Sequence, residues 1–193
     1  MQELSLKPSE VMTGDTVIHN IEKLNEYYQR LKSGEQILPI FVVDPYSYTI
    51  ENFRYDLEKI KKNYTPLEFR IMDFNSAKLG EDLICKTKRG VKYLLCDGNH
   101  RSIAYALAGL EISAKQVENF IDIRAIIREF GTQTLSVMYN SESMRHFMFS
   151  LFRGLCRTNY RSLTIEDKVS VLRSSNELKL ENGIITYQPN CPF

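Results

Sequence analysis

Apolar residues recur at three- and four-residue steps in several stretches of the chain, the pattern typical of amphipathic helices. Ser33-Gly34 and Gly109 stand where two such helices would end, because glycine readily takes the left-handed conformation that closes a helix. Thr164 stands where a third helix would need an N-terminal cap. The spacing predicts helices over residues 20–32, 50–63, 102–110, 141–157 and 164–174.

Short apolar runs, continuous or alternating with polar residues, predict strands. The clearest is ILPIFVV, residues 37–43, whose unbroken apolar character indicates a strand buried on both faces. Lys88-Arg89-Gly90 and Asn182-Gly183 are turn sequences that predict two hairpins. Further strands are predicted over residues 67–74, 83–87, 91–96 and 120–128. The mixture of elements predicts an α/β (α+β) fold with a mixed sheet flanked by helices.

The balance of elements changes after residue 130, where Gly131 marks a boundary. Strands and helices alternate before it, whereas two helices and a short hairpin follow it. We therefore expect a main domain over residues 1–130 and a helical extension with a terminal hairpin over residues 131–193, packed on the main domain. A chain of 193 residues is long enough to bury a sizeable core in this way.

Charge and composition make DNA-binding and membrane proteins less favoured classes for this chain. The 25 basic and 24 acidic residues give a net charge of +1, so DNA is a less favoured partner. No stretch approaches the roughly 18 apolar residues of a membrane span, and residues 1–10 do not resemble a signal peptide. The four cysteines form no CxxC pair. We expect a cytoplasmic protein with reduced thiols, no membrane partner, and Cys85 and Cys96 packed within strands.

The stretch DGNHRS, residues 97–102, lies where a predicted strand becomes a predicted helix. Gly98 allows a sharp turn, and the free backbone N–H groups of the following helix form an anion site. Arg101 offers a planar set of donors suited to phosphate, and His100 offers a further donor or a titrating group. Asp97 would hold Mg²⁺, a ribose hydroxyl or the loop itself. The same residues also fit an ordinary turn with a helix cap.

Four stretches, in their order along the chain, resemble the ParB/sulfiredoxin-like superfamily. KPSEV (7–11) is similar to its opening turn, LKSGEQ (31–36) to the end of its first helix, and LPIFVVD (38–44) to the strand that follows. DGNHRSIAYALAGL (97–110) resembles its loop and helix, in which a DG-x-HR box precedes an alanine-containing helix. The resemblance covers roughly residues 4–130 and implies the ParB/sulfiredoxin-like fold.

The resemblance also implies a nucleotide site, because the box binds nucleotide phosphates in that superfamily. Its members include CTP-binding DNA-partition proteins, sulfiredoxins and free serine kinases. This chain departs from sulfiredoxins, since Asn99 stands where their reactive cysteine lies. It departs from complete partition proteins, since the helices predicted after residue 140 are not markedly basic. The cofactor-binding residues implied are Gly98, Asn99, His100, Arg101 and Ser102.

The resulting expectation is a phosphotransferase or hydrolase that uses ATP, ADP or CTP with Mg²⁺ and acts on a small acceptor. Asp97 would be metal ligand or base, and His100 and Arg101 would stabilise developing charge. The alternative is a regulatory module in which the bound nucleotide controls contact with DNA or a protein. A nuclease ranks third, because no cluster of carboxylates suggests a two-metal site.

Overall fold

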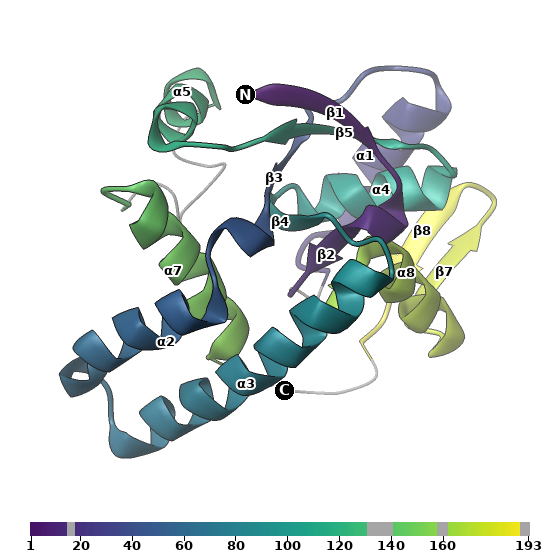
Figure 1. Ribbon diagram of the computed structural model, residues 1–193. Helices are drawn as coiled ribbons and strands as arrows, with labels where there is room; N and C mark the ends of the chain where they lie inside the picture. The colour runs from purple at the N-terminus through teal and green to yellow at the C-terminus, as the bar shows by residue number, and fades with distance from the viewer. Residues whose placement is uncertain (15–17, 131–140, 158–161, 190–193) are drawn as a thin grey trace.

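The computed structural model describes residues 1–14, 18–130, 141–157 and 162–189 (Figure 1). A six-stranded mixed sheet lies at its centre, in the order β1-β5-β3-β4-β2-β6. Antiparallel and parallel pairings alternate across it, from the antiparallel β1–β5 pair to the antiparallel β2–β6 pair. The mixed α/β class predicted from the sequence is confirmed. The strands are β1 (Gln2–Leu6), β2 (Val11–Thr13), β3 (Ile40–Val43), β4 (Tyr93–Asp97), β5 (Ile112–Gln116) and β6 (Leu163–Thr164).

Helices cover both faces of the sheet, and two separate apolar cores result. One face carries α1 (Ile21–Lys32), α4 (Asn99–Ala108), α8 (Ile165–Ser174) and a hairpin of β7 (Leu178–Glu181) and β8 (Ile184–Tyr187). The other carries α2 (Ile50–Lys59), α3 (Pro66–Lys88), α5 (Phe120–Phe130) and α7 (Met144–Cys156). In Figure 1, α2, α3 and α7 lie together at the lower left and the first group lies to the right. Short 3₁₀ turns occupy Pro8–Glu10, Pro45–Ser47 and Lys61–Asn63.

Strand β3 connects the two cores. Phe41 and Val43 point into the core of α2, α3, α5 and α7, whereas Ile40 and Val42 point into the core of α1, α4 and α8. Successive side chains of a strand face opposite sides of the sheet, so helices on both sides bury all four of them. This explains the unbroken apolar run from which the strand was predicted, and it confirms that prediction.

The strands predicted over residues 67–74 and 83–87, and the hairpin between the second of these and residues 91–96, are wrong. A single helix, α3, runs from Pro66 to Lys88. It begins with a capping box in which the Thr65 hydroxyl accepts from the Glu68 N–H and the Glu68 carboxylate accepts from the Thr65 N–H. Apolar residues lie on both sides of this helix, which produced the apparent alternation. Cys85 is consequently exposed on a helix instead of packed in a strand.

The strand predicted over residues 120–128 is also wrong, because this segment forms α5. The side-chain oxygen of Asn119 accepts hydrogen bonds from the N–H groups of Ile121 and Asp122 and so starts the helix. Ile123 and Ile126 then lie three positions apart on the buried side. The predicted helices over residues 20–32 and 164–174, and the hairpin at Asn182-Gly183, are confirmed.

Segments from the last third of the chain take part in both cores and in the sheet. Strand β6 pairs with β2, so that Thr164 lies opposite Met12. The Lys86 ammonium group on α3 donates to the carbonyl oxygen of Ser162 at 2.6 Å. The β7–β8 hairpin lies on α1, where the Asn25 side chain exchanges two hydrogen bonds of 2.7 Å with the backbone of Ile185. The expected boundary at Gly131 lies outside the described residues.

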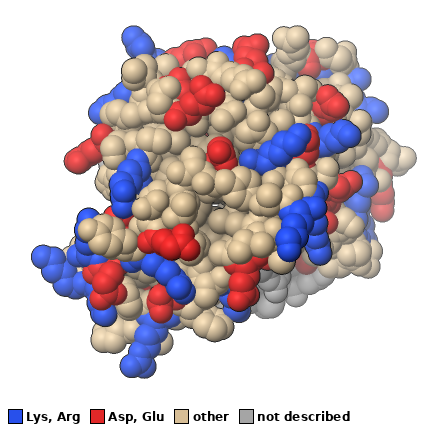
Figure 2. Space-filling model, in the orientation of Figure 1, with Lys and Arg blue, Asp and Glu red and all other residues tan. Residues whose placement is uncertain are grey.

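Charged side chains of both signs are interspersed over the face of the molecule seen in Figure 2. This agrees with the net charge of +1 and shows no field of a single sign on that face. Within the described ranges, no helix has both the length and the hydrophobicity that crossing a bilayer requires.

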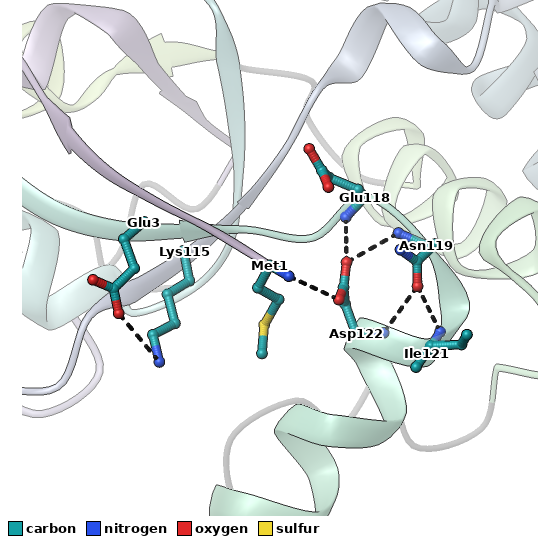
Figure 3. Close-up of polar contacts among 7 residues, drawn as sticks. All are labelled: Met1, Glu3, Lys115, Glu118, Asn119, Ile121 and Asp122. Carbon is teal, nitrogen blue, oxygen red and sulfur yellow. Dashed lines mark hydrogen bonds and ion pairs between the residues drawn. The ribbon is translucent and has the colours of Figure 1, made fainter.

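Asp122 ties the start of α5 to the beginning of the chain (Figure 3). Its carboxylate accepts hydrogen bonds from the N–H groups of Glu118 and Asn119, at 3.0 and 3.3 Å. The α-ammonium group of Met1 donates to its other oxygen at 3.1 Å. Burial acts to raise the pKa of Asp122, but these contacts outweigh it and lower the pKa below its ordinary value. The charged carboxylate is therefore favoured in the folded state.

Replacing Asp122 by Asn is expected to lower the free energy of unfolding by about 1–2 kcal/mol at pH 7, since a buried charged acceptor is lost. Because the folded pKa is lowered, this stabilisation is present above the unfolded pKa of about 4 and is lost as the pH falls through the folded value. Urea denaturation of both proteins between pH 7 and pH 3 measures the difference, which should shrink toward acid. A difference that does not change with pH would contradict this account.

Candidate functional site

The turn between β4 and α4 requires glycine at position 98. Gly98 has a φ of +101°, in the left-handed region that side chains rarely adopt. A Cβ atom added there would lie 2.7 Å from Cγ2 of Ile40 on the neighbouring strand β3. Gly98 is thus required by the backbone and by packing against the sheet. Helix α4 begins directly after it, at Asn99, three residues earlier than the sequence predicted.

Asp97 and Arg101 form an ion pair across this turn. The Arg101 side chain is 7% exposed and that of Asp97 is 25% exposed. Arg101 also donates from Nη1 to the carbonyl oxygen of Pro39 at 2.6 Å, just before β3. Burial raises the pKa of Asp97, while the Arg101 guanidinium and the Gly98 N–H oppose that rise. The pair fixes the end of β4 to the residue that leads into β3.

Two of the residues predicted for catalysis, Asp97 and Arg101, therefore lie together, and they bind each other. The donors of Arg101 face Asp97 and Pro39, so they hold the turn in its conformation. The Asp97 carboxylate accepts from Arg101, which is a different task from the predicted one of metal ligand or base. Each group would have to give up this contact to reach a ligand.

His100 connects the first turn of α4 to the start of α1. Its Nε2 atom accepts a hydrogen bond of 3.0 Å from the backbone N–H of Asn20. Asn20 is itself the N-terminal cap of α1, because its side-chain oxygen accepts from the Lys23 N–H. This arrangement needs an unprotonated Nε2, so the neutral ring carries its hydrogen on Nδ1.

Asn99 lies against a lysine that sequence analysis did not single out. The Lys168 ammonium group of α8 donates to Oδ1 of Asn99 at 2.9 Å, and Lys168 is only 1% exposed. Lys168 falls between Ile165 and Leu172 on the buried side of α8. A lysine on the apolar side of an amphipathic helix was the available signal, since such a residue needs a polar partner inside the protein.

Ser102 lies inside the first turn of α4 and is fully buried. Its hydroxyl donates to the carbonyl oxygen of Asn99 at 2.9 Å, and its N–H donates to the Gly98 carbonyl oxygen. Of the residues predicted to bind nucleotide, Ser102 and Arg101 are buried, and Asn99 and His100 are partly exposed. The exposed part of the box is thus the beginning of α4 itself.

The N-terminus of α4 differs chemically from most other helix starts in this protein. Its N-cap residue, Gly98, has no side chain to cap it, whereas the side chains of Asn20, Thr49, Thr65, Ser143 and Thr164 cap α1, α2, α3, α7 and α8. A helix N-terminus carries partial positive charge on its N–H groups, and the Lys168 ammonium group lies beside it. Two sources of positive charge therefore meet at this turn.

A metal site built from side chains alone needs several ligating residues in one place. Over the described part of the chain, no group of three or more His, Cys, Asp or Glu residues is arranged to hold a metal ion. Asp97 is the carboxylate within the box, and it is paired with Arg101. Cys96 precedes it, and burial, together with the charge of Asp97, raises the pKa of its thiol well above the ordinary value.

An open pocket of about 780 Å³ lies at the other end of α4, against α8 and the 3₁₀ turn at Pro8–Glu10. Its lining combines basic, acidic and small residues: Lys7, Pro8, Ala106, Gly109, Leu110, Glu111, Glu166, Val169, Ser170, Arg173 and Ser174. A ten-residue helix is about 15 Å long, so this pocket is separate from the box at the start of α4.

Comparison with protein-family models, with curated proteins and with solved structures gave no match.

Replacing Arg101 by Leu is expected to lower the free energy of unfolding by about 2–3 kcal/mol, because Asp97 stays in a partly buried position without its partner. The double variant Asp97→Asn, Arg101→Leu should recover part of this loss, since it removes the unpaired charge. Urea denaturation of the wild type, both single variants and the double variant measures the coupling. A loss below about 0.5 kcal/mol for Arg101→Leu would show that the pair does not hold the turn.

Proposed function

We propose that this chain is a nucleotide-binding protein of the ParB/sulfiredoxin-like type, in which the N-terminus of α4 receives the phosphates. The observation that carries the proposal is the glycine turn that starts α4 directly beside the buried Lys168 ammonium group. A phosphate would accept hydrogen bonds from backbone N–H groups of the first turn of α4, and Lys168 would neutralise part of its charge.

Asp97 and Arg101 have a supporting role in this proposal. Their ion pair and the bond from Arg101 to Pro39 hold Gly98 in the left-handed turn from which α4 begins. His100 fixes the start of α1 against the same turn through Asn20. Preorganised donors of this kind bind an anion without an ordering cost at the time of binding.

The position of residues 97–102 in the fold supports the proposal. Strand β4 lies inside the sheet, between β3 and β2, and leads through a glycine turn into a helix packed on the sheet. Phosphate sites are common where a strand passes through a glycine turn into a helix N-terminus. The order of strand, DGNHR turn and helix is also the part of the chain that most resembles the superfamily.

Binding is favoured over phosphoryl transfer, because the carboxylate that would serve as base or metal ligand is paired with Arg101. We therefore place the regulatory module, in which nucleotide controls contact with another molecule, ahead of the kinase or hydrolase. The near-neutral net charge and the interspersed charges of Figure 2 favour a protein partner over DNA.

Calorimetric titration with ATP, ADP, CTP, GTP, UTP and pyrophosphate, each with and without Mg²⁺, tests the proposal. We expect at least one nucleotide to bind, and Lys168→Met to weaken it about tenfold or more, equivalent to about 1.4 kcal/mol. Lys179→Met, on the exposed side of β7, is the matched control and should leave affinity unchanged. Circular dichroism melting of each variant shows that the fold is kept.

Two further readouts separate the alternatives. Phosphate release measured on the bound nucleotide distinguishes transfer or hydrolysis from binding alone. Binding of a labelled duplex at rising salt detects a DNA partner. If neither nucleotides nor pyrophosphate bind, or if Lys168→Met binds as tightly as the wild type, the proposed site is wrong.

A further inference from the structure

Helix α3 has an apolar outer face as well as an apolar inner one. Its inner face packs against the core through Met72, Leu79 and Leu83. On the opposite side, Leu67 is 68% exposed, and Phe74 and Ile84 are each 62% exposed. Large apolar side chains repeated along one exposed helix face are unusual in a monomer and indicate an interaction surface.

The outer face follows the spacing of a coiled-coil seam. Residues 3.5 positions apart on average lie in one line along a helix and meet a partner helix. We call this line the outer seam of α3. Its members are all exposed and alternate by three and four positions: Leu67, Arg70, Phe74, Ala77, Glu81, Ile84 and Lys88.

We propose that the outer seam pairs with the outer seam of a second copy of this chain, antiparallel and about a two-fold axis. An axis that passes between positions 75 and 76 brings Leu67 opposite Ile84 of the second copy. The same axis brings Arg70 opposite Glu81, and Phe74 opposite Ala77. Each of these contacts occurs twice, as two-fold symmetry requires.

The opposed side chains complement each other in size and in charge. The large Phe74 ring meets the small Ala77 side chain, and two aliphatic residues, Leu67 and Ile84, meet near the ends. Arg70 and Glu81 form two ion pairs in this register. A parallel pairing would instead place Arg70 against Arg70 and Glu81 against Glu81, where like charges repel. The sequence of the outer seam therefore selects the antiparallel orientation.

The charged members of the outer seam are available for this contact. Neither the Arg70 nor the Glu81 side chain makes an ion pair or hydrogen bond with another residue in the described ranges. Many other charged residues of this protein are paired within the chain, as Arg54 is with Asp73 and Lys92 with Glu10. Pairing across the two-fold axis would give Arg70 and Glu81 the partners that the single chain does not supply.

Lys78, which lies next to the outer seam, fits the same arrangement. The Lys78 ammonium group lies 4.6 Å from the centre of the Phe74 ring, at the side of the outer seam. Its aliphatic stem extends the apolar surface while the charge stays in water. Two helices in such contact lie about 8–10 Å apart.

One helix per chain gives an interface below the standard size of about 1,600 Å², so we expect a weak, concentration-dependent dimer.

Sedimentation equilibrium from about 1 to about 200 µM tests the dimer, since weak self-association is expected in the micromolar range. Arg70→Glu and Glu81→Arg should each weaken dimerisation about tenfold or more, because each sets like charges opposite one another in both symmetry-related pairs. An equimolar mixture of the two variants should dimerise again, because one chain then carries glutamate at both positions and faces arginine at both positions of the other. Lys23→Glu and Glu22→Arg, exposed on α1, make comparable charge changes and should have no effect.

Cysteine cross-linking tests the orientation. In a background that carries Cys85→Ser and Cys191→Ser, a Leu67→Cys chain mixed with an Ile84→Cys chain should form a disulfide-linked dimer under mild oxidation. Neither chain should do so alone. A protein that stays monomeric over the whole concentration range overturns the proposal. A dimer that ignores the charge changes, or that cross-links Leu67→Cys to itself, overturns it equally.

Discussion

The fold depends on burial of β3 on both faces. Each of its four side chains is almost completely removed from water, which contributes about 1.5–3 kcal/mol per large apolar residue. A strand of this kind needs a helical layer on each side of the sheet, and the two layers come from different parts of the chain. The box at residues 97–102 is fixed to this strand twice, through the packing of Gly98 on Ile40 and the bond from Arg101 to Pro39. The geometry of the candidate site is therefore set by the central strand.

The sequence predicted two amphipathic helices well. Helices α1 and α8 have a clear apolar face and a capping residue, Asn20 or Thr164, and both were found. Helix α3 was misread as strands because its inner and outer faces are both apolar, which removes the helical period. Strands β1 and β6 were missed because pairing with distant segments forms them, and their own residues are few or largely exposed.

One part of the candidate site could be predicted from the sequence and another part could not. The junction of strand, glycine turn and helix follows from local sequence, and it lies where the pattern of residues 91–110 predicted it. The partners of its side chains do not follow from local sequence. Arg101 meets Pro39 from 62 positions away, and Asn99 meets Lys168 from 69 positions away. Sequence chemistry alone assigned Arg101 to a ligand, whereas the fold surrounds it with its own chain, where its charge stabilises the turn.

The pairing of β6 with β2 has a consequence for how the chain folds during synthesis. When residues 1–130 have left the ribosome, β2 still lacks a neighbour on one side, and the face of α4 that contacts α8 is uncovered. Unpaired strand edges and exposed apolar helices are the features that chaperones recognise and that drive aggregation. The sheet reaches its full width only after residues 163–164 emerge, so it is completed late, by pairing between segments about 150 positions apart.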